Sequence, residues 1–251
     1  MVYVYAAAAV IGMLIGSFLN VCIHRLPLNE SVAAPRSRCP SCRRPIRVWD
    51  NIPLISYLWL RGRCRDCGRS ISLRYPLVEF LNGAGYVLVL WRFGPGLPAA
   101  VYALLFSAFV VVTFIDLDHQ IIPDRITYPG MLIGLAASAW VLPTGLLNAA
   151  IGLLAGGALF YLVALLSRGG MGGGDIKYIA MIGAFLGWKQ MLLTIFLGAT
   201  SGSVIGLILM AFMGKTRKYP VPFGPFLSLG AVVSLFAGPE IWEWYQRLGA
   251  F

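Results

Sequence analysis

The stretch GLLNAAIGLLAGGALFYLVALLS, residues 145–167, decides the fold class of this chain. It contains no charged side chain, and about 20 apolar residues in a helix are enough to cross the hydrocarbon layer of a bilayer. Similar uncharged stretches occupy residues 1–23, 97–115, 126–142, 191–213 and 221–239. Two weaker candidates are residues 75–91, which include Glu79, and residues 176–188, which include Lys177. We therefore expect an all-α polytopic membrane protein with about eight transmembrane helices.

The composition agrees with a membrane protein. Hydrophobic residues make up 59% of the 251 positions and charged residues only 12%, so polar side chains are too few to cover a soluble globule. The first stretch lacks a basic segment before its apolar run and continues into the rest of the chain. We expect it to be a retained helix rather than a cleaved signal.

The net charge of +10 is unevenly distributed along the chain. Residues 24–74 carry eleven arginines. If the eight helices alternate in direction, six further basic residues fall on the same side of the membrane and three on the other; the six are Arg125, Arg168, Lys177, Lys215, Arg217 and Lys218, and the three are Arg92, Lys189 and Arg247. The positive-inside rule then places residues 24–74 in the cytoplasm and the N-terminus outside. This pattern explains the charge without a nucleic-acid partner.

The same pattern predicts three parts of the chain. Residues 1–23 form the first transmembrane helix, residues 24–74 form a small cytoplasmic module between helices 1 and 2, and residues 75–251 form the remaining transmembrane core.

Residues 24–74 contain two closely spaced cysteine pairs, Cys39 with Cys42 and Cys64 with Cys67. Thiolates two residues apart bind one ion from a tight turn, and two such pairs are typical of a tetrahedral zinc site. Disulfides are the alternative, but a reducing cytoplasm favours zinc. Four thiolates leave no open position for water, so we expect the zinc to be structural. Cys22 stands apart, and we interpret it as a buried apolar side chain.

Two acidic motifs indicate chemistry: Asp116 in FIDLDHQIIPD, residues 114–124, and Asp175 in GGGDIK, residues 172–177. Two predicted helices separate them, so we expect both aspartates at the same membrane surface. Asp116 and Asp118 point to nearly opposite sides of a helix, and the residues alone do not decide which one faces the interior. Pro123 disfavours helix at the preceding residue, so we expect Asp124 in a loop.

The residues before Asp175 are mostly glycine and indicate a loop rather than a helix. Such glycines permit either positive φ or a close approach of the backbone to a neighbour. A flexible linker is the alternative interpretation.

At these residues the chain resembles the type IV prepilin peptidases, bacterial inner-membrane aspartic proteases that process pilin and type II secretion pseudopilin precursors. The resemblance extends over nearly the whole chain. It includes GSFLNVCIHRLP at residues 16–27, both cysteine pairs, RYPLVE at residues 74–79, both acidic motifs and PFGPF at residues 222–226. The Gly-x-Gly-Asp element is also similar to that of presenilin-like intramembrane proteases.

The resemblance implies a catalytic pair. In that family the first catalytic aspartate lies seven residues before the proline of the Ile-Pro element, which is Asp116 here, and the second ends the Gly-x-Gly-Asp element, which is Asp175 here. Supporting candidates are Gly172, Gly174, Lys177, Asp118, Asp124 and Glu79, and the three acids among them are candidate contacts for a basic leader peptide. The implied partners are prepilin and pseudopilin precursors and the lipid bilayer.

The resemblance also implies a second activity, N-methylation of the newly exposed N-terminal residue with S-adenosylmethionine as donor. Some family members that lack the cysteine module only cleave, so its presence here favours the bifunctional form. The sequence contains no Gly-x-Gly-x-x-Gly fingerprint at a suitable place, and the residues of the methyl-donor site remain unassigned.

Two other classes of function also fit parts of the sequence. Aspartates near broken, glycine-rich helices occur in ion-coupled transporters, and a membrane protein with a zinc module is also suited to act as an assembly scaffold of a secretion apparatus. Transport sites lie near the midplane of the bilayer, whereas Asp116 and Asp175 are predicted at helix ends.

Overall fold

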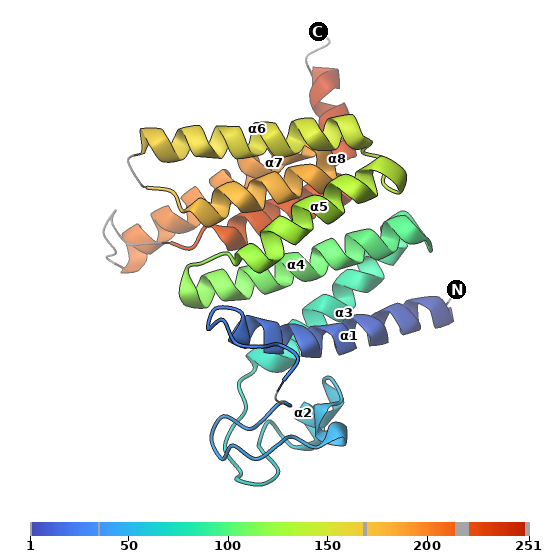
Figure 1. Cartoon of the computed structure of the whole chain (residues 1–251), viewed down its shortest axis with the longest axis vertical. Coiled ribbons are helices and arrows are strands. Elements are labelled where there is room, and N and C mark those ends of the chain that lie inside the picture. Colours follow the sequence, from blue (N-terminus) through green and yellow to red (C-terminus); the bar gives the residue numbers. More distant parts are fainter. Residues whose placement is uncertain (1, 35, 168–169, 214–220, 249–251) are drawn as a thin grey trace. The chain divides into compact units, whose positions relative to one another are not determined.

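A computed structural model describes residues 2–34, 36–167, 170–213 and 221–248 (Figure 1). Four residues counted in the charge argument lie outside these ranges: Arg168, Lys215, Arg217 and Lys218. Within the described residues, regular structure consists almost entirely of α-helices, with one 3-10 turn and two isolated β-bridges. The chain divides into two compact units, residues 1–111 and residues 112–251.

In the first unit, helix α1 (Val2–Arg25) packs against helix α3 (Arg74–Phe93). Glycines on α1 make this contact close: a Cβ atom at Gly16 would lie 2.8 Å from the Cα atom of Glu79. Asn82 is completely buried and connects three helices, because its Nδ2 donates to the Gly12 carbonyl at 2.7 Å and its Oδ1 accepts from Ser107 of α4 (Leu97–His119) at 2.9 Å. Small residues and buried polar groups are the usual means by which membrane helices associate.

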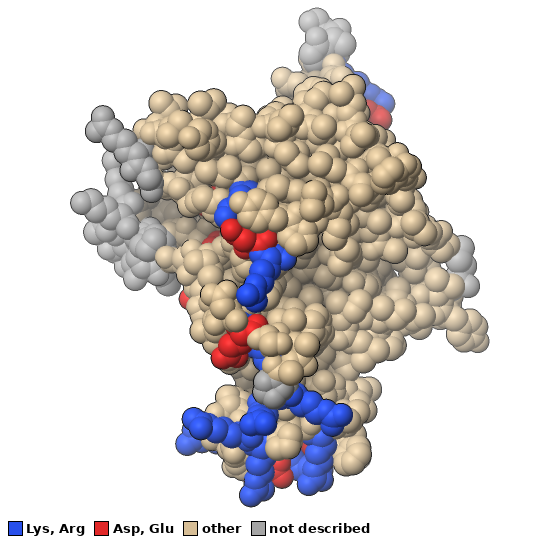
Figure 2. Space-filling view, in the orientation of Figure 1, with Lys and Arg blue, Asp and Glu red and all other residues tan. Residues whose placement is uncertain are grey.

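The polar segment between α1 and α3 contains the 3-10 turn η1 (Val48–Asn51) and the short helix α2 (Ile55–Trp59). Its basic side chains are conspicuous in Figure 2, where Lys and Arg gather at the foot of the view and the visible face of the helices is mostly uncharged. Cys22, at the end of α1, is buried, as expected for an apolar side chain.

The second unit contains the end of α4 and four further helices, α5 (Asp124–Trp140), α6 (Leu146–Leu166), α7 (Gly173–Met213) and α8 (Gly224–Leu248). Helix α7 packs against α5, α6 and α8, so it is the central helix of this unit. The approach of α6 to α7 depends on facing glycines, because a Cβ atom at Gly152 would lie 2.6 Å from the carbonyl oxygen of Gly183.

Helix α7 is interrupted at Gly187, which has φ 78° and ψ 174°. Only glycine adopts such angles readily. Side-chain hydroxyls satisfy two carbonyls near the break: Ser138 donates to Ala184 and Thr144 donates to Phe185, each at 2.9 Å. A membrane helix tolerates an interruption when neighbouring helices supply hydrogen bonds in this way.

The helical membrane fold is confirmed, but fewer helices than the expected eight are long and apolar enough to cross a membrane. Within the described residues, five helices are long and apolar enough to cross a membrane: α1, α4, α6, α7 and α8. The predicted stretches 176–188 and 191–213 correspond to the parts of α7 before and after the break at Gly187. The other two form α3, which carries Arg74, Glu79 and Arg92, and α5, which has 17 residues.

Candidate active site and metal centre

Asp116 lies in the last turn of α4. The helix ends soon after it because Gln120 adopts a left-handed conformation, with φ 54°, and Pro123 then precedes α5. Asp116 is buried, with 5% of its surface exposed. Its Oδ2 accepts a hydrogen bond of 2.8 Å from the backbone N–H of Gly224, the first residue of α8. A donor at a helix N-terminus thus fixes this carboxylate.

Asp175 lies in the first turn of α7 and is half-buried. Its backbone N–H donates to the Gly172 carbonyl at 3.1 Å, which forms the turn that begins the helix. The Asp116 carboxylate acts electrostatically on that of Asp175. The end of α4 and the start of α7 therefore bring both aspartates to one end of the second unit.

Among the glycines directly before Asp175, Gly174 is explained by close approach, and positive φ explains none of them. Positive-φ glycines occur elsewhere in the described chain, but Gly172, Gly173 and Gly174 are not among them. A Cβ atom at Gly174 would lie 3.0 Å from the Cβ atom of Ile122, whereas one at Gly173 would meet nothing within 4 Å. The expected loop also ends earlier than predicted, since Gly173 and Gly174 already belong to α7.

A chain of hydrogen-bonded hydroxyls leads from Tyr178 through Ser228 to the Gly224 carbonyl. The Tyr178 and Ser228 hydroxyls are 2.6 Å apart, and Ser228 donates to the Gly224 carbonyl at 2.9 Å. All three residues are buried, and Asp116 acts electrostatically on the Tyr178 hydroxyl. Gly224 therefore binds Asp116 through its N–H and the hydroxyl chain through its carbonyl.

The other predicted acids occupy different surroundings. Asp118 is exposed, so Asp116 is the one of the two that faces the interior. The expectation that Asp124 lies in a loop is wrong, because Asp124 is the first residue of α5, where an acid interacts favourably with the helix dipole. Asp124 pairs with Lys177, whose ammonium also lies 5.4 Å from the centre of the Tyr128 ring. Glu79 belongs to the first unit, and its carboxylate accepts a hydrogen bond from the backbone N–H of Leu54 at 2.9 Å.

The four cysteines of the module lie on two similar turns. In the first, the N–H of Cys39 donates to Arg44 at 3.0 Å, and in the second the N–H of Cys64 donates to Arg69 at 2.8 Å. The residue after each pair, Arg43 or Gly68, has a positive φ. The local sequence thus forms the same tight turn twice, and each turn presents two sulfur atoms.

The two turns bring all four Sγ atoms to one place, within 4.8 Å of one another. The sulfurs of Cys39 and Cys67 are 3.9 Å apart, which is far beyond a disulfide bond of about 2.05 Å. Zinc–sulfur bonds of about 2.3 Å in a tetrahedron require sulfurs about 3.8 Å apart, so this arrangement fits zinc. The backbone N–H of Cys42 lowers the pKa of the Cys39 thiol to about 7, whereas the pKa of the Cys67 thiol is raised to about 11.

Sequence reasoning missed Gly224, Tyr178 and Ser228 as members of the site. The PFGPF motif around Gly224 was a usable signal, but only tertiary structure shows that this glycine donates to an aspartate 108 residues earlier. Tyr178 and Ser228 lie in ordinary apolar helical sequence, which gives no indication of their role.

These observations define a multi-pass membrane protein with two aspartates at one end of a helical unit and a separate four-cysteine module. Comparison with known families is consistent with both parts: residues 10–93 match the Bacterial Peptidase A24 N-terminal domain and residues 103–207 match the Type IV leader peptidase family. The chain belongs to the type IV leader peptidase family.

Curated relatives cover nearly the whole chain. A prepilin leader peptidase/N-methyltransferase from Stutzerimonas stutzeri is 39% identical, with 96% of this chain and 93% of that protein aligned. Proteins of the same name from Aeromonas hydrophila and Pseudomonas aeruginosa are 38% and 35% identical, with 93% and 96% of this chain and 90% and 93% of those proteins aligned. No solved structure gives a significant match to the chain.

Proposed function

We propose that this protein cleaves the basic leader peptide from type IV prepilins and type II secretion pseudopilins and then N-methylates the new N-terminal residue. The observation that carries the proposal is the position of Asp116 and Asp175 at the same end of the second unit, in a chain of the leader peptidase family. The relatives named above carry both activities in their names.

The two aspartates supply an acid and a base. Two neighbouring carboxylates do not both ionise readily, so one remains protonated and polarises the scissile carbonyl while the other accepts a proton from water. The water oxygen then bonds to the carbonyl carbon, the peptide C–N bond breaks, and the departing amine receives a proton. In this scheme the Gly224 N–H holds Asp116 in place during the proton transfers.

The substrate fits a site at a membrane surface. A prepilin carries a short basic leader before an apolar helix, and the junction lies at the cytoplasmic surface when the helix is in the bilayer. The exposed acids Asp118 and Asp124 are candidate contacts for the basic leader, and Lys177 positions Asp124. We place the protein in the bacterial inner membrane, with its N-terminus in the periplasm and the module and active site in the cytoplasm.

We assign the metal as one structural zinc ion bound by the four cysteines, because their spacing and the convergence of their four sulfur atoms suit zinc thiolate chemistry. The methyl donor is S-adenosylmethionine. Methylation forms a bond between the amine nitrogen and the donor methyl carbon while the sulfur–carbon bond breaks; S-adenosylhomocysteine leaves, and the amine proton passes to solvent.

The two alternative functions are not favoured. An ion-coupled transporter and a secretion scaffold explain neither the family membership nor the position of both aspartates in terminal turns of helices.

The test is the cleavage of a purified prepilin in detergent, with and without S-adenosylmethionine, followed by mass spectrometry. We expect Asp116→Asn and Asp175→Asn each to lower the cleavage rate by about 10³-fold or more, because each removes one member of the acid–base pair. Glu243→Gln, at an exposed acid of α8, is the control and should cleave normally. Wild-type turnover by either aspartate variant would exclude that residue from the pair.

A further inference from the structure

Residues 48–59 of the module, which include η1 and α2, expose large apolar side chains. The exposed fractions are 77% for Val48, 62% for Trp49, 62% for Ile55, 75% for Leu58 and 80% for Trp59. In α2 the last three of these are three and four residues apart, so they share one face of the helix. So much exposed apolar surface in one short segment indicates an interaction with another apolar surface.

The segment is held in a defined shape. The Ser56 hydroxyl donates to the Trp49 carbonyl at 2.7 Å and accepts from the Ile52 N–H at 3.1 Å, which connects η1 to α2. Because Ser56 is buried while its neighbour Ile55 is exposed, the segment has an inner and an outer side. The exposed apolar side chains therefore belong to a folded element.

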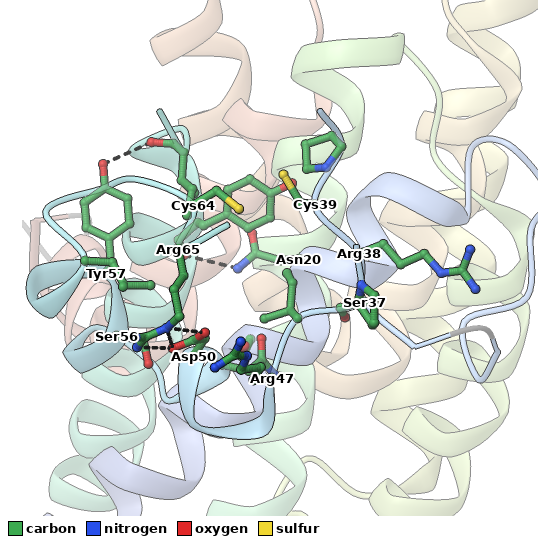
Figure 3. A pocket seen from close by; sticks show the side chains of 18 of the residues that line it. Asn20, Ser37, Arg38, Cys39, Arg47, Asp50, Ser56, Tyr57, Cys64 and Arg65 are labelled. Carbon is green, nitrogen blue, oxygen red and sulfur yellow. Dashed lines mark hydrogen bonds and ion pairs between the residues drawn. The ribbon is translucent and has the colours of Figure 1, made fainter. Parts of the chain in front are cut away.

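The inner side of the segment faces a cavity of about 560 Å³ between the module and the ends of α1 and α3 (Figure 3). Ser56, Tyr57 and Leu60 line this cavity, together with Glu79 and several arginines. The five exposed apolar residues lie outside its lining. They face away from the contacts that fold the module, and another partner has to cover them.

The segment is attached to the helices at the depth of the lipid layer. The Leu54 N–H donates to the Glu79 carboxylate of α3 at 2.9 Å, and the backbone of Glu79 packs against Gly16 of α1. Gly16 is nine residues before Arg25, the last residue of α1, which is about 14 Å along the helix. The 24 residues of α1 are about 36 Å long and a hydrocarbon layer is about 30 Å thick, so Gly16 lies inside this layer when α1 crosses the bilayer.

Figure 1 agrees with this depth, since α2 is level with the α1 ribbon rather than beyond its end. Exposed side chains at this level meet lipid instead of water. Tryptophan is enriched at the boundary between acyl chains and headgroups, where its ring is apolar and its N–H remains near water. Trp49 and Trp59 are therefore suited to this position.

Exposed arginines flank the segment along the chain. Arg43 precedes it, and Arg61 and Arg63 follow it. Basic side chains beside an apolar face are typical of elements that lie in the plane of a membrane surface, because they attract the phosphates of acidic lipids. A prepilin helix is the other apolar partner available, but its basic leader would be repelled by the same arginines.

We propose that η1 and α2 dock on the lipid leaflet next to the module, and that this leaflet contains acidic lipid. Ile55, Leu58 and Trp59 enter the boundary between acyl chains and headgroups, and Arg61 and Arg63 bind lipid phosphate. The inference goes beyond the proposed function, since these residues belong neither to the aspartate pair nor to the metal site. The module is then partly embedded in the membrane instead of being surrounded by water.

The test uses the wild-type, full-length protein in nanodiscs of phosphatidylethanolamine and phosphatidylglycerol that contain a lipid with a photoactivatable diazirine on its acyl chain. Trypsin cleaves after Arg47 and Arg61, so residues 48–61 form one peptide. We expect this peptide to carry label after irradiation. Label confined to the long helices would overturn the proposal. Cross-linking of the peptide to an added prepilin, without label from the lipid, would overturn it in favour of a substrate surface.

The contribution of lipid charge is measured on the same protein. In nanodiscs of phosphatidylcholine alone, with the same photoactivatable lipid, we expect labelling of residues 48–61 to fall by about threefold or more, because the arginines lose their acidic partners. Equal labelling in the two kinds of nanodisc would overturn the assignment of acidic lipid.

A pair of variants tests the apolar contact. We expect a Leu58→Ser, Trp59→Ser double variant to reduce labelling of the peptide by about threefold or more, because membrane binding of such an element scales with its buried apolar area. Leu73→Ser is the matched control, since Leu73 is 73% exposed in the same module but lies outside the segment. Equal labelling of residues 48–61 in the double variant and the control would show that α2 does not enter the bilayer.

Discussion

The backbone N–H of Gly224 holds one member of the candidate catalytic pair in place, because it donates directly to Asp116 Oδ2 at 2.8 Å. No side chain fits there: a Cβ atom at Gly224 would lie 2.8 Å from the same oxygen and 3.2 Å from the Asp116 Cβ atom. Glycine is therefore needed at this position to let the helix N-terminus reach the carboxylate.

At this residue we expect Gly224→Ala to lower the cleavage rate by about 10²-fold, because a displaced carboxylate is no longer aligned for proton transfer. Gly206→Ala is the matched control, since a Cβ atom there meets nothing within 4 Å. Cleavage kinetics of both variants decide the matter. A Gly224→Ala enzyme as active as Gly206→Ala would show that the contact does not position Asp116.

The glycines before Asp175 offer a second test on neighbouring residues. Gly174→Ala places a methyl group 3.0 Å from Ile122, whereas Gly173→Ala places one in open space. We expect Gly174→Ala to reduce cleavage by about tenfold or more through a shift of Asp175, and Gly173→Ala to retain wild-type activity. Rates measured on one prepilin under identical conditions suffice, and equal loss in the two variants would contradict this account.

Among the elements, α7 has the most neighbours in the second unit and carries Asp175 in its first turn. Its position depends on backbone contact with α6 at Gly152 and Gly183, and on the break at Gly187. Because apolar attraction between helices is weak in a lipid environment, close packing of this kind largely determines how α7 is held.

For this helix pair we expect Gly152→Ala to lower the free energy of unfolding by about 1–3 kcal/mol, because the added methyl group overlaps the Gly183 carbonyl. Gly157→Ala, on the same helix, places its Cβ atom 3.5 Å from Ala180, an ordinary contact, and should stay within about 1 kcal/mol of the wild type. Denaturation in mixed micelles compares the two. Similar destabilisation by both changes would mean that the Gly152 contact has no special importance.

At the scale of the whole molecule, the candidate functional residues fall into two groups, one in each unit. The aspartates, Gly224 and the hydroxyl chain belong to residues 112–251, and the cysteine module and the cavity belong to residues 1–111. Loss of the metal would unfold the small module, since a polar segment of this size buries little apolar surface of its own. The second unit has its own packed helices, so we expect its fold not to depend on the metal.

For the whole protein we expect a Cys64→Ser, Cys67→Ser double variant to lose its zinc and most of its methylation while it retains part of its cleavage. The wild type should contain about one zinc ion per chain, as four thiolates at one site imply. Cys22→Ala, at a buried cysteine of α1, should keep both the metal and both activities. Metal analysis and mass spectrometry of the pilin products provide the readouts, and equal loss of both activities would show that the module also shapes the protease site.

The sequence by itself determined the helical membrane class and the two cysteine pairs, because apolar length and Cys-x-x-Cys spacing are local properties. It predicted more spans than the five helices that are long and apolar enough to cross a membrane, since it counted the two parts of α7 around Gly187 separately and included α3 and α5. It also left the choice between Asp116 and Asp118 open on physical grounds. Which carboxylate is buried depends on packing against helices that lie far away in the chain.

Only the tertiary structure brought Gly224 to Asp116 and Glu79 to the wall of a cavity facing arginines. The partners in each case are distant in sequence, so their distances depend on how whole helices pack. The sequence analysis grouped Glu79 with the acids of the second unit. In the structure, its carboxylate accepts a hydrogen bond from Leu54 of the cysteine module. Local patterns fix which residues are available for chemistry, and packing between distant helices decides which of them meet.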